Sequence, residues 1–207
     1  MAKLYFRYGT MNSGKTAGLL MAAHNFEESH QQILILKPAL DSKAGPALYT
    51  RMGIERLVDH LVTADDDVFS LAKDWLASIE GKTIGGILVD EAQFLTTAQV
   101  DQLLMAALKL NIPVLCYGLR TDFLTKVFPG SARLLETAHT LEELKTMCGA
   151  GCRRKANFNA RKVGGQFVLH GDQISIDNQE DVEYIALCGQ CFLELVGPID
   201  GRREDDA

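Results

Sequence analysis

The chain has 207 residues, of which 47% are hydrophobic and 23% are charged, the composition of a soluble globular protein with room for one domain and a small appendage. A net charge of −6 argues against a surface that follows a nucleic-acid backbone, because that affinity comes mainly from Lys and Arg. The N-terminal apolar run is too short for a signal peptide, and no run reaches the length of a membrane span. We therefore expect a cytoplasmic protein that binds neither nucleic acid nor membranes.

Strand and helix patterns alternate along roughly the first 140 residues. Apolar runs predict buried strands at 4–8, 33–36, 86–89 and 112–118. Helical spacing of apolar residues predicts helices at 14–29 and 68–79, and the capping-box pair Thr96 and Gln99 predicts a third helix that ends near Lys109. Apolar strands separated by amphipathic helices indicate an α/β fold, with a mostly parallel sheet covered by helices on both faces.

The pattern changes from about residue 141, where cysteines, glycines and short alternating segments replace the helix-length patterns. We interpret this part as a small β-rich domain that is held together by something other than a large core. The expected domains are 1–142 for nucleotide binding, 143–196 for the β-rich domain and 197–207 for a loose polar tail.

Residues 9–16, GTMNSGKT, match the phosphate-loop pattern and stand between a predicted strand and a predicted helix, the context that the motif requires. Gly9 and Gly14 allow a tight backbone whose N–H groups point at phosphate oxygens, and the helix adds the positive end of its dipole. Lys15 is expected to reach the β- and γ-phosphates, and Thr16 to offer its hydroxyl to Mg²⁺. The alternative is a glycine turn that matches by chance, and its place in the chain argues against that.

Two carboxylates, Asp90 and Glu91, follow the third predicted strand, at the sheet edge where α/β proteins bind ligands. Asp90 suits a magnesium site of the Walker B kind. Glu91 could activate water, as in an NTPase, or accept a proton from a substrate hydroxyl, as in a kinase. A strand end with solvated acids is the remaining alternative.

Four of the five cysteines form two close pairs, Cys148 with Cys152 and Cys188 with Cys191, around a short β-rich stretch. Four thiolates can hold Zn²⁺ tetrahedrally, and a domain with little core often needs such a site. Redox chemistry or simple burial is the alternative. Cys116 lies inside a predicted strand and is expected to be a core residue.

The ordered set GTMNSGKT, VDEAQF, YGLRTDF and the paired cysteines resembles the thymidine kinases of the zinc-containing type, from about Leu4 to Phe192. The resemblance implies a P-loop, RecA-like sheet and transfer of the γ-phosphate of ATP, with Mg²⁺, to the 5′-hydroxyl of thymidine or deoxyuridine. It also implies structural Zn²⁺, a homotetramer and inhibition by dTTP. Glu91 matches the family's general base.

The resemblance assigns further residues to the two substrates. It places ATP at Gly9, Thr10, Met11, Asn12, Ser13, Gly14, Lys15, Thr16, Asp41, Asp90 and Gln93. It places the nucleoside at Met11, Phe94, Leu119, Asp122, Phe123, Phe128, Arg161 and Tyr184, the last on a lasso segment before Cys188.

Some positions depart from the family pattern. Lys43 stands where the family often has Arg, and Asp177 and Asn178 stand where the lasso tends to have two glycines. The preference for thymidine over related nucleosides is therefore open. A P-loop ATPase with a zinc module is the alternative function. A helicase would need a second domain and a basic groove, and a nucleotide sensor would not need Lys15, Thr16, Asp90 and Glu91 together.

Overall fold

Two units, interleaved along the chain, make up the computed structural model, which describes residues 1–39, 45–51, 53–171 and 182–198. The first unit comprises Met1–Tyr8, Gly14–Gly118 and Pro129–Glu143. The second comprises Gly9–Ser13, Leu119–Phe128 and Leu144–Ala207. The predicted boundaries at 142 and 196 stay predictions, because contacts between residues show which segments pack together and not which segments fold independently.

The sheet of the first unit is parallel throughout, with strand order β5-β2-β6-β7-β1-β8 in the described part of the chain. Its central strands are the predicted apolar runs, and most of their side chains are buried because helices cover both faces. In chain order the strands are β1 Leu4–Tyr8, β2 Gln32–Pro38, β5 His60–Val62, β6 Ile84–Val89, β7 Val114–Gly118 and β8 Thr140–Glu143.

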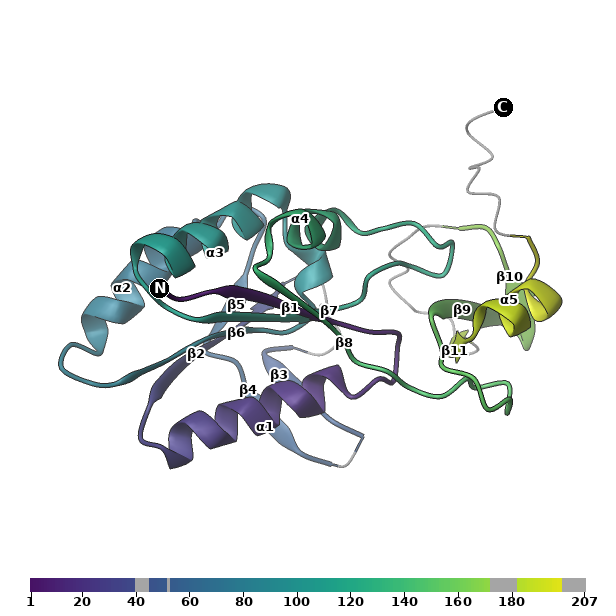
Figure 1. Cartoon of the computed structure of the whole chain (residues 1–207), viewed down its shortest axis with the longest axis horizontal. Helices are drawn as coiled ribbons and strands as arrows, with labels where there is room; N and C mark the ends of the chain where they lie inside the picture. The colour runs from purple at the N-terminus through teal and green to yellow at the C-terminus, as the bar shows by residue number, and fades with distance from the viewer. Residues whose placement is uncertain (40–44, 52, 172–181, 199–207) are drawn as a thin grey trace. The chain divides into compact units, whose positions relative to one another are not determined.

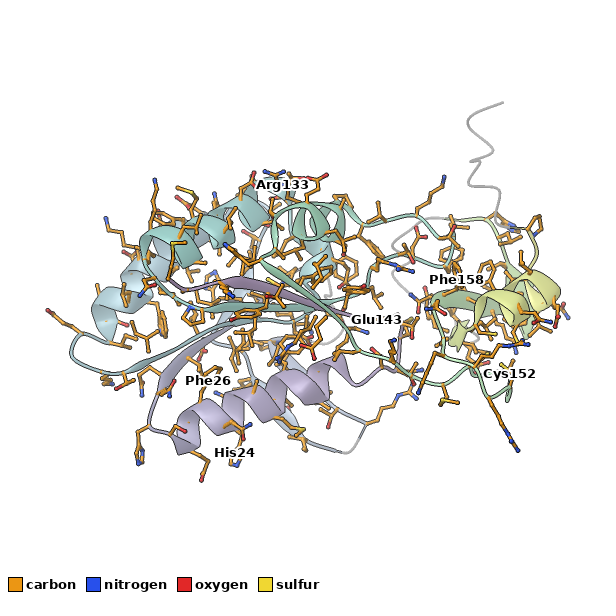
Figure 2. The ribbon with its side chains drawn as sticks, viewed as in Figure 1. His24, Phe26, Arg133, Glu143, Cys152 and Phe158 are labelled. Atoms are coloured by element: carbon orange, nitrogen blue, oxygen red, sulfur yellow. The ribbon has the colours of Figure 1, made fainter. Side chains whose placement is uncertain are left out.

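Helices cover both faces of this sheet, as Figure 1 shows. Helix α1, Lys15–Glu28, packs on β2, β6 and β7, and Phe26 projects from its sheet side while His24 lies on its outer side (Figure 2). Helices α2, Val68–Ser78, α3, Thr97–Lys109, and α4, Pro129–Thr137, lie along the other face. The predicted α/β class is confirmed.

The predicted start of α3 is confirmed in detail. Thr96 Oγ1 accepts from the Gln99 backbone N–H at 3.2 Å, and Gln99 Oε1 accepts from the Thr96 N–H at 3.1 Å. Other elements of this unit carried no clear sequence signal. They are α4, the edge strands β5 and β8, and an antiparallel pair made of β3, Ala47–Tyr49, and β4, Glu55–Leu57.

A three-stranded antiparallel sheet forms the centre of the second unit, with order β10-β9-β11. Its strands are β9 Phe158–Val163, β10 Gln166–Val168 and β11 Val182–Leu187. A short helix, α5, Gly189–Leu195, follows β11, although no helix-length pattern is evident in this part of the sequence. Seven residues give too little sequence for a helical period to be visible. The helix packs Phe192 against Phe158, and the two ring centroids lie 5.3 Å apart. Figure 2 labels Phe158 beside this helix.

Among the described residues, no helix combines the length and the hydropathy that crossing a membrane requires.

Candidate active site

The first half of the phosphate loop, Gly9–Ser13, belongs to the second unit. A side chain at Gly9 would meet Ser13 Oγ and would lie 2.6 Å from the Leu144 carbonyl oxygen, so only glycine fits there. Ser13 Oγ is buried and finds no hydrogen-bond partner among the described residues. A buried hydroxyl of this kind suits a ligand oxygen.

The second half of the loop opens helix α1 in the first unit. Gly14 has a φ of 78°, the left-handed conformation that favours glycine, and no side chain caps the helix start. The first helical N–H groups therefore remain available for an anion. Lys15 follows and is buried; burial lowers the pKa of its ammonium, while Glu91 and Asp90 act in the opposite direction. A buried cation at a helix start is suited to a polyphosphate.

Asp90 lies directly after β6, where its side chain is 3% exposed. Its Oδ2 accepts from Thr16 Oγ1 at 3.0 Å, whereas buried Oδ1 has no hydrogen-bond partner among the described residues. Burial, with Glu91 as the second cause, raises the pKa of Asp90 to about 7. A cation would remove this penalty, and a carboxylate beside a hydroxyl is an oxygen donor set that fits Mg²⁺.

Glu91 joins β6 to the short helix η1, Ala92–Phe94, and has a φ of 48°, which is rare for a residue other than glycine. Its Oε2 accepts from Gln93 Nε2 at 2.5 Å. Gln93 is 1% exposed and lies against Gly118 at the end of β7. Phe94 ends the same turn and is half-buried.

Most residues assigned to the nucleoside gather in the second unit, and one residue that the sequence analysis missed connects them. Buried Asn159 on β9 accepts from the Met11 N–H at 2.8 Å and donates to the Thr121 carbonyl oxygen at 2.9 Å. It therefore connects the phosphate loop, the Leu119–Phe128 segment and the β9 strand within this unit. No local pattern identifies Asn159, because both partners are distant in sequence.

Arg161 and its neighbours form a second group on the same strand. The Arg161 guanidinium lies over the Phe123 ring at 4.0 Å from its centroid, and its Nη2 donates to the His170 carbonyl oxygen at 3.1 Å. Tyr184 is its direct cross-strand neighbour on β11. Aromatic and cationic side chains so arranged suit the face of a planar base.

Asp122 also stabilises a turn of the second unit. Its Oδ1 accepts from the backbone N–H groups of Leu124 and Lys126, both at 2.8 Å, and so holds the turn that precedes Phe128. Phe123 and Phe128 are nearly fully buried, and Met11 and Leu119 are half-buried. Asp41, Lys43 and the lasso residues Asp177 and Asn178 lie outside the described residues.

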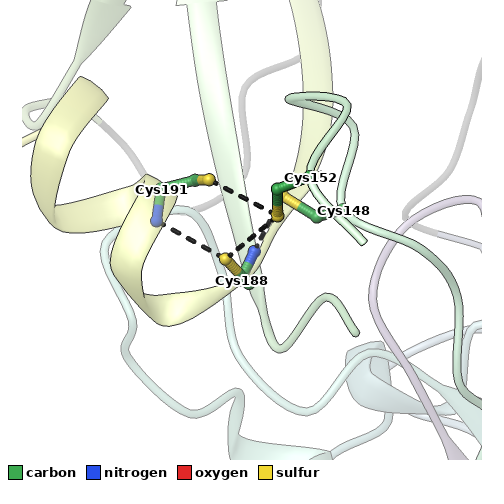
Figure 3. A group of neighbouring side chains, drawn as sticks. All are labelled: Cys148, Cys152, Cys188 and Cys191. Atoms are coloured by element: carbon green, nitrogen blue, oxygen red, sulfur yellow. Dashed lines mark hydrogen bonds between the residues drawn. The ribbon is translucent and has the colours of Figure 1, made fainter. Parts of the chain in front are cut away.

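The four paired cysteines converge in the second unit, as Figure 3 shows, with all four Sγ atoms within 4.8 Å of one another. Cys152 Sγ lies 3.6 Å from both Cys188 Sγ and Cys191 Sγ. Zn–S bonds of about 2.3 Å in a tetrahedron place sulfurs about 3.8 Å apart, so the group fits zinc. The Cys191 backbone N–H, which donates to Cys188 Sγ at 3.5 Å, lowers the pKa of that thiol to about 6 and favours the thiolate that a metal needs.

Cys116, by contrast, is fully buried in β7, and burial raises the pKa of its thiol. It behaves as the core residue that the sequence predicts.

Comparison with known proteins places these features in context. A family model described as thymidine kinase matches residues 2–192. Thymidine kinases from Mannheimia succiniciproducens, Chromobacterium violaceum and Enterobacteria phage T4 are 44%, 43% and 43% identical to this chain. Those alignments cover 96%, 93% and 94% of this chain and 99%, 98% and 97% of the relatives. Among solved structures, the Pif1 helicase from Candida albicans has a TM-score of 0.38 at 12% identity, over 69% of this chain and 36% of its own.

Proposed function

The chain belongs to the thymidine kinase family, and from that membership we propose that it transfers the γ-phosphate of ATP to the 5′-hydroxyl of thymidine, giving dTMP. Deoxyuridine, which differs by one methyl group, is a second acceptor in this proposal. The observation that carries the proposal is the group formed in the first unit by buried Lys15 and Asp90 with half-buried Thr16 and Glu91, because it combines phosphate, metal and proton-transfer chemistry.

The roles follow from the chemistry of each side chain. Lys15 and the loop N–H groups bind the β- and γ-phosphates. Thr16 Oγ1 and Asp90 would hold Mg²⁺, which neutralises charge on the phosphates when bound. Glu91 accepts the proton of the 5′-hydroxyl as that oxygen attacks phosphorus, which makes the oxygen a better nucleophile.

The second unit favours a nucleoside over water as the acceptor. Its apolar and aromatic side chains, Met11, Leu119, Phe123 and Phe128, are of the type that lines small-molecule sites. An ATPase, the alternative function from the sequence, would not need this second set of side chains, because its acceptor is water. We assign the four cysteines a structural zinc ion, because they already provide four ligands and no position remains open for chemistry.

The test measures transfer of labelled phosphate from ATP–Mg to thymidine, deoxyuridine, deoxycytidine, a purine deoxynucleoside and water. We expect label in dTMP and little in free phosphate. Replacing Glu91 with Gln should lower transfer by about 10²-fold or more while ATP still binds, because the proton acceptor is lost. Label released only as free phosphate would identify an ATPase.

Three expectations remain proposals: inhibition by dTTP and assembly as a homotetramer, which the family resemblance implies, and the cytoplasmic location expected from the sequence. The first two are open to direct measurement. Adding dTTP to the transfer assay should lower the rate, and light scattering of the purified protein should give four times the chain mass of 22.7 kDa.

A further inference from the structure

The backbone around Glu91 is held in an unusual conformation. Glu91 has φ 48° and ψ 38°, a left-handed conformation that is unfavourable for an L-residue other than glycine. It ends the buried β6 strand and precedes η1, whose Leu95 N–H donates back to the Ala92 carbonyl oxygen at 3.2 Å. A strained residue at the end of a buried strand persists only when its surroundings hold it there.

Gln93 holds the Glu91 side chain. Its amide Nε2 lies 2.5 Å from Glu91 Oε2, and a carboxylate can only accept, so the amide must present its N–H₂ group to it. Glu91 Oε1 makes no hydrogen bond to any described residue. One carboxylate oxygen is therefore tied to the protein and the other remains free to accept a proton.

The turn that carries Gln93 packs closely against two glycines from other elements of the first unit. A side chain at Gly118, at the end of β7, would lie 2.7 Å from Gln93 Oε1 and 3.1 Å from the Gln93 backbone nitrogen. A side chain at Gly130, in the first turn of α4, would lie 2.7 Å from the carbonyl oxygens of Ala92 and Leu95. Any Cβ at either position would push the turn that carries Gln93.

We propose that Gln93 is a positioning residue for the general base: it orients the Glu91 carboxylate, and close packing at Gly118 and Gly130 keeps Gln93 in register. The resemblance assigned Gln93 to ATP binding, so this is a different role for the same side chain. The inference rests on the proposed function, in which Glu91 accepts the proton of the acceptor hydroxyl.

The test is a double-mutant cycle with Gln93→Met, which keeps the length of the side chain and removes the donor. We expect kcat for ATP-dependent thymidine phosphorylation to fall about tenfold or more, since a misplaced base loses much of its effect. The Kd for ATP should stay within about twofold, because Gln93 does not act on the nucleotide. Combined with Glu91→Gln, the same substitution should lower kcat by less than about twofold, because the carboxylate it positions is gone.

Gln102→Met is the matched control. Gln102 Oε1 accepts from the Val68 N–H at 2.9 Å, in the contact between α3 and α2, so this variant changes an equivalent side chain away from Glu91. Its kcat should equal that of the unchanged protein. Gly118→Ala approaches the same amide from β7 and should repeat the loss of kcat, which keeps the test valid where Gln93→Met folds poorly.

An equal loss of kcat in both backgrounds would overturn the inference, and so would a weaker Kd for ATP with kcat unchanged. The second would make Gln93 a nucleotide ligand. Full turnover of Glu91→Gln would remove the proposed base and this inference together. Full turnover of Gln93→Met beside an inactive Glu91→Gln would overturn this inference alone.

Discussion

At the scale of single residues, the first unit buries two ionisable side chains in surroundings that disfavour their charged forms. Lys15 and Asp90 are both nearly fully buried, and burial shifts the pKa of each toward its neutral form. Mutual attraction offsets only part of the desolvation that burying charged groups requires. The stability of the ligand-free protein is therefore reduced at the positions where ATP and a cation are expected to bind.

Replacing Lys15 with Met tests this reasoning. ATP affinity should fall about 10- to 100-fold, because a charge-assisted contact worth about 1.5–3 kcal/mol is lost. The melting temperature without ligand should not decrease, because the desolvation cost of a buried ammonium is removed and Asp90, whose pKa is raised to about 7, can bind a proton in its place. Calorimetric titration with ATP and thermal unfolding give the two values.

Lys73→Met on α2 is the control for Lys15→Met, since Lys73 is exposed and belongs to neither substrate group. Both its ATP affinity and its melting temperature should stay unchanged. A clear drop in the ligand-free melting temperature of Lys15→Met alone would show that the ammonium stabilises the fold.

At the scale of elements, side chains that accept hydrogen bonds from the first N–H groups of a helix stabilise its start. Asp67 Oδ1 accepts from the Phe69 and Ser70 N–H groups at the start of α2, and Thr96 does the same for Gln99 at the start of α3. Cys188 precedes helix α5 as its N-cap residue, and its sulfur accepts from the Cys191 N–H. The α1 helix lacks a side-chain cap, and its start is the one that carries the phosphate-loop sequence.

Substituting Thr96 with Ala should lower the free energy of unfolding by about 1 kcal/mol, because the N-cap bond to Gln99 is lost. Urea unfolding measures this change. Thr97→Ala, one residue further and also exposed, is the matched control and should leave stability nearly unchanged. Equal losses in the two variants would show that the capping box contributes nothing specific.

At the scale of the whole molecule, the second unit has a small core for its length. Its buried cluster is built from Ala160, Leu187, Phe192 and three of the four cysteines. The cysteines come from two segments, the turn at Cys148–Cys152 and the junction of β11 with α5, so a bound ion would join them. Metal binding would then supply much of the folding free energy of this unit.

Cys188→Ser should remove the zinc, because three thiolates and a hydroxyl make a weaker site, and should loosen β11 with Tyr184. Metal analysis of the purified protein should give about one zinc per chain before the change and little after it. Cys116→Ala changes the fifth cysteine, which is buried in β7, and should retain the metal. Full zinc content in Cys188→Ser would refute the four-cysteine assignment.

Features that depend on neighbouring residues can be predicted from the amino-acid sequence alone. Strands β1, β2, β6 and β7 follow from apolar runs, and the start of α3 follows from Thr96 and Gln99. The phosphate loop, the two carboxylates after β6 and the spacing of the cysteine pairs are likewise local patterns, so residue types and spacing alone predict their chemistry. The family resemblance added the acceptor, which the residues alone do not specify.

Other features depend on residues that are distant in the sequence, and these are visible in the tertiary structure alone. Strand β8 is a short polar edge that exists because it pairs with β1, about 135 residues earlier in the chain, as the Arg7–Glu142 contact illustrates. Asn159 connects to Met11 across 148 residues. The turn that carries Gln93 and Glu91 packs closely against Gly118 and Gly130 because neither position carries a side chain. Such contacts arise from packing of separate elements, and no periodicity or spacing in the sequence encodes them.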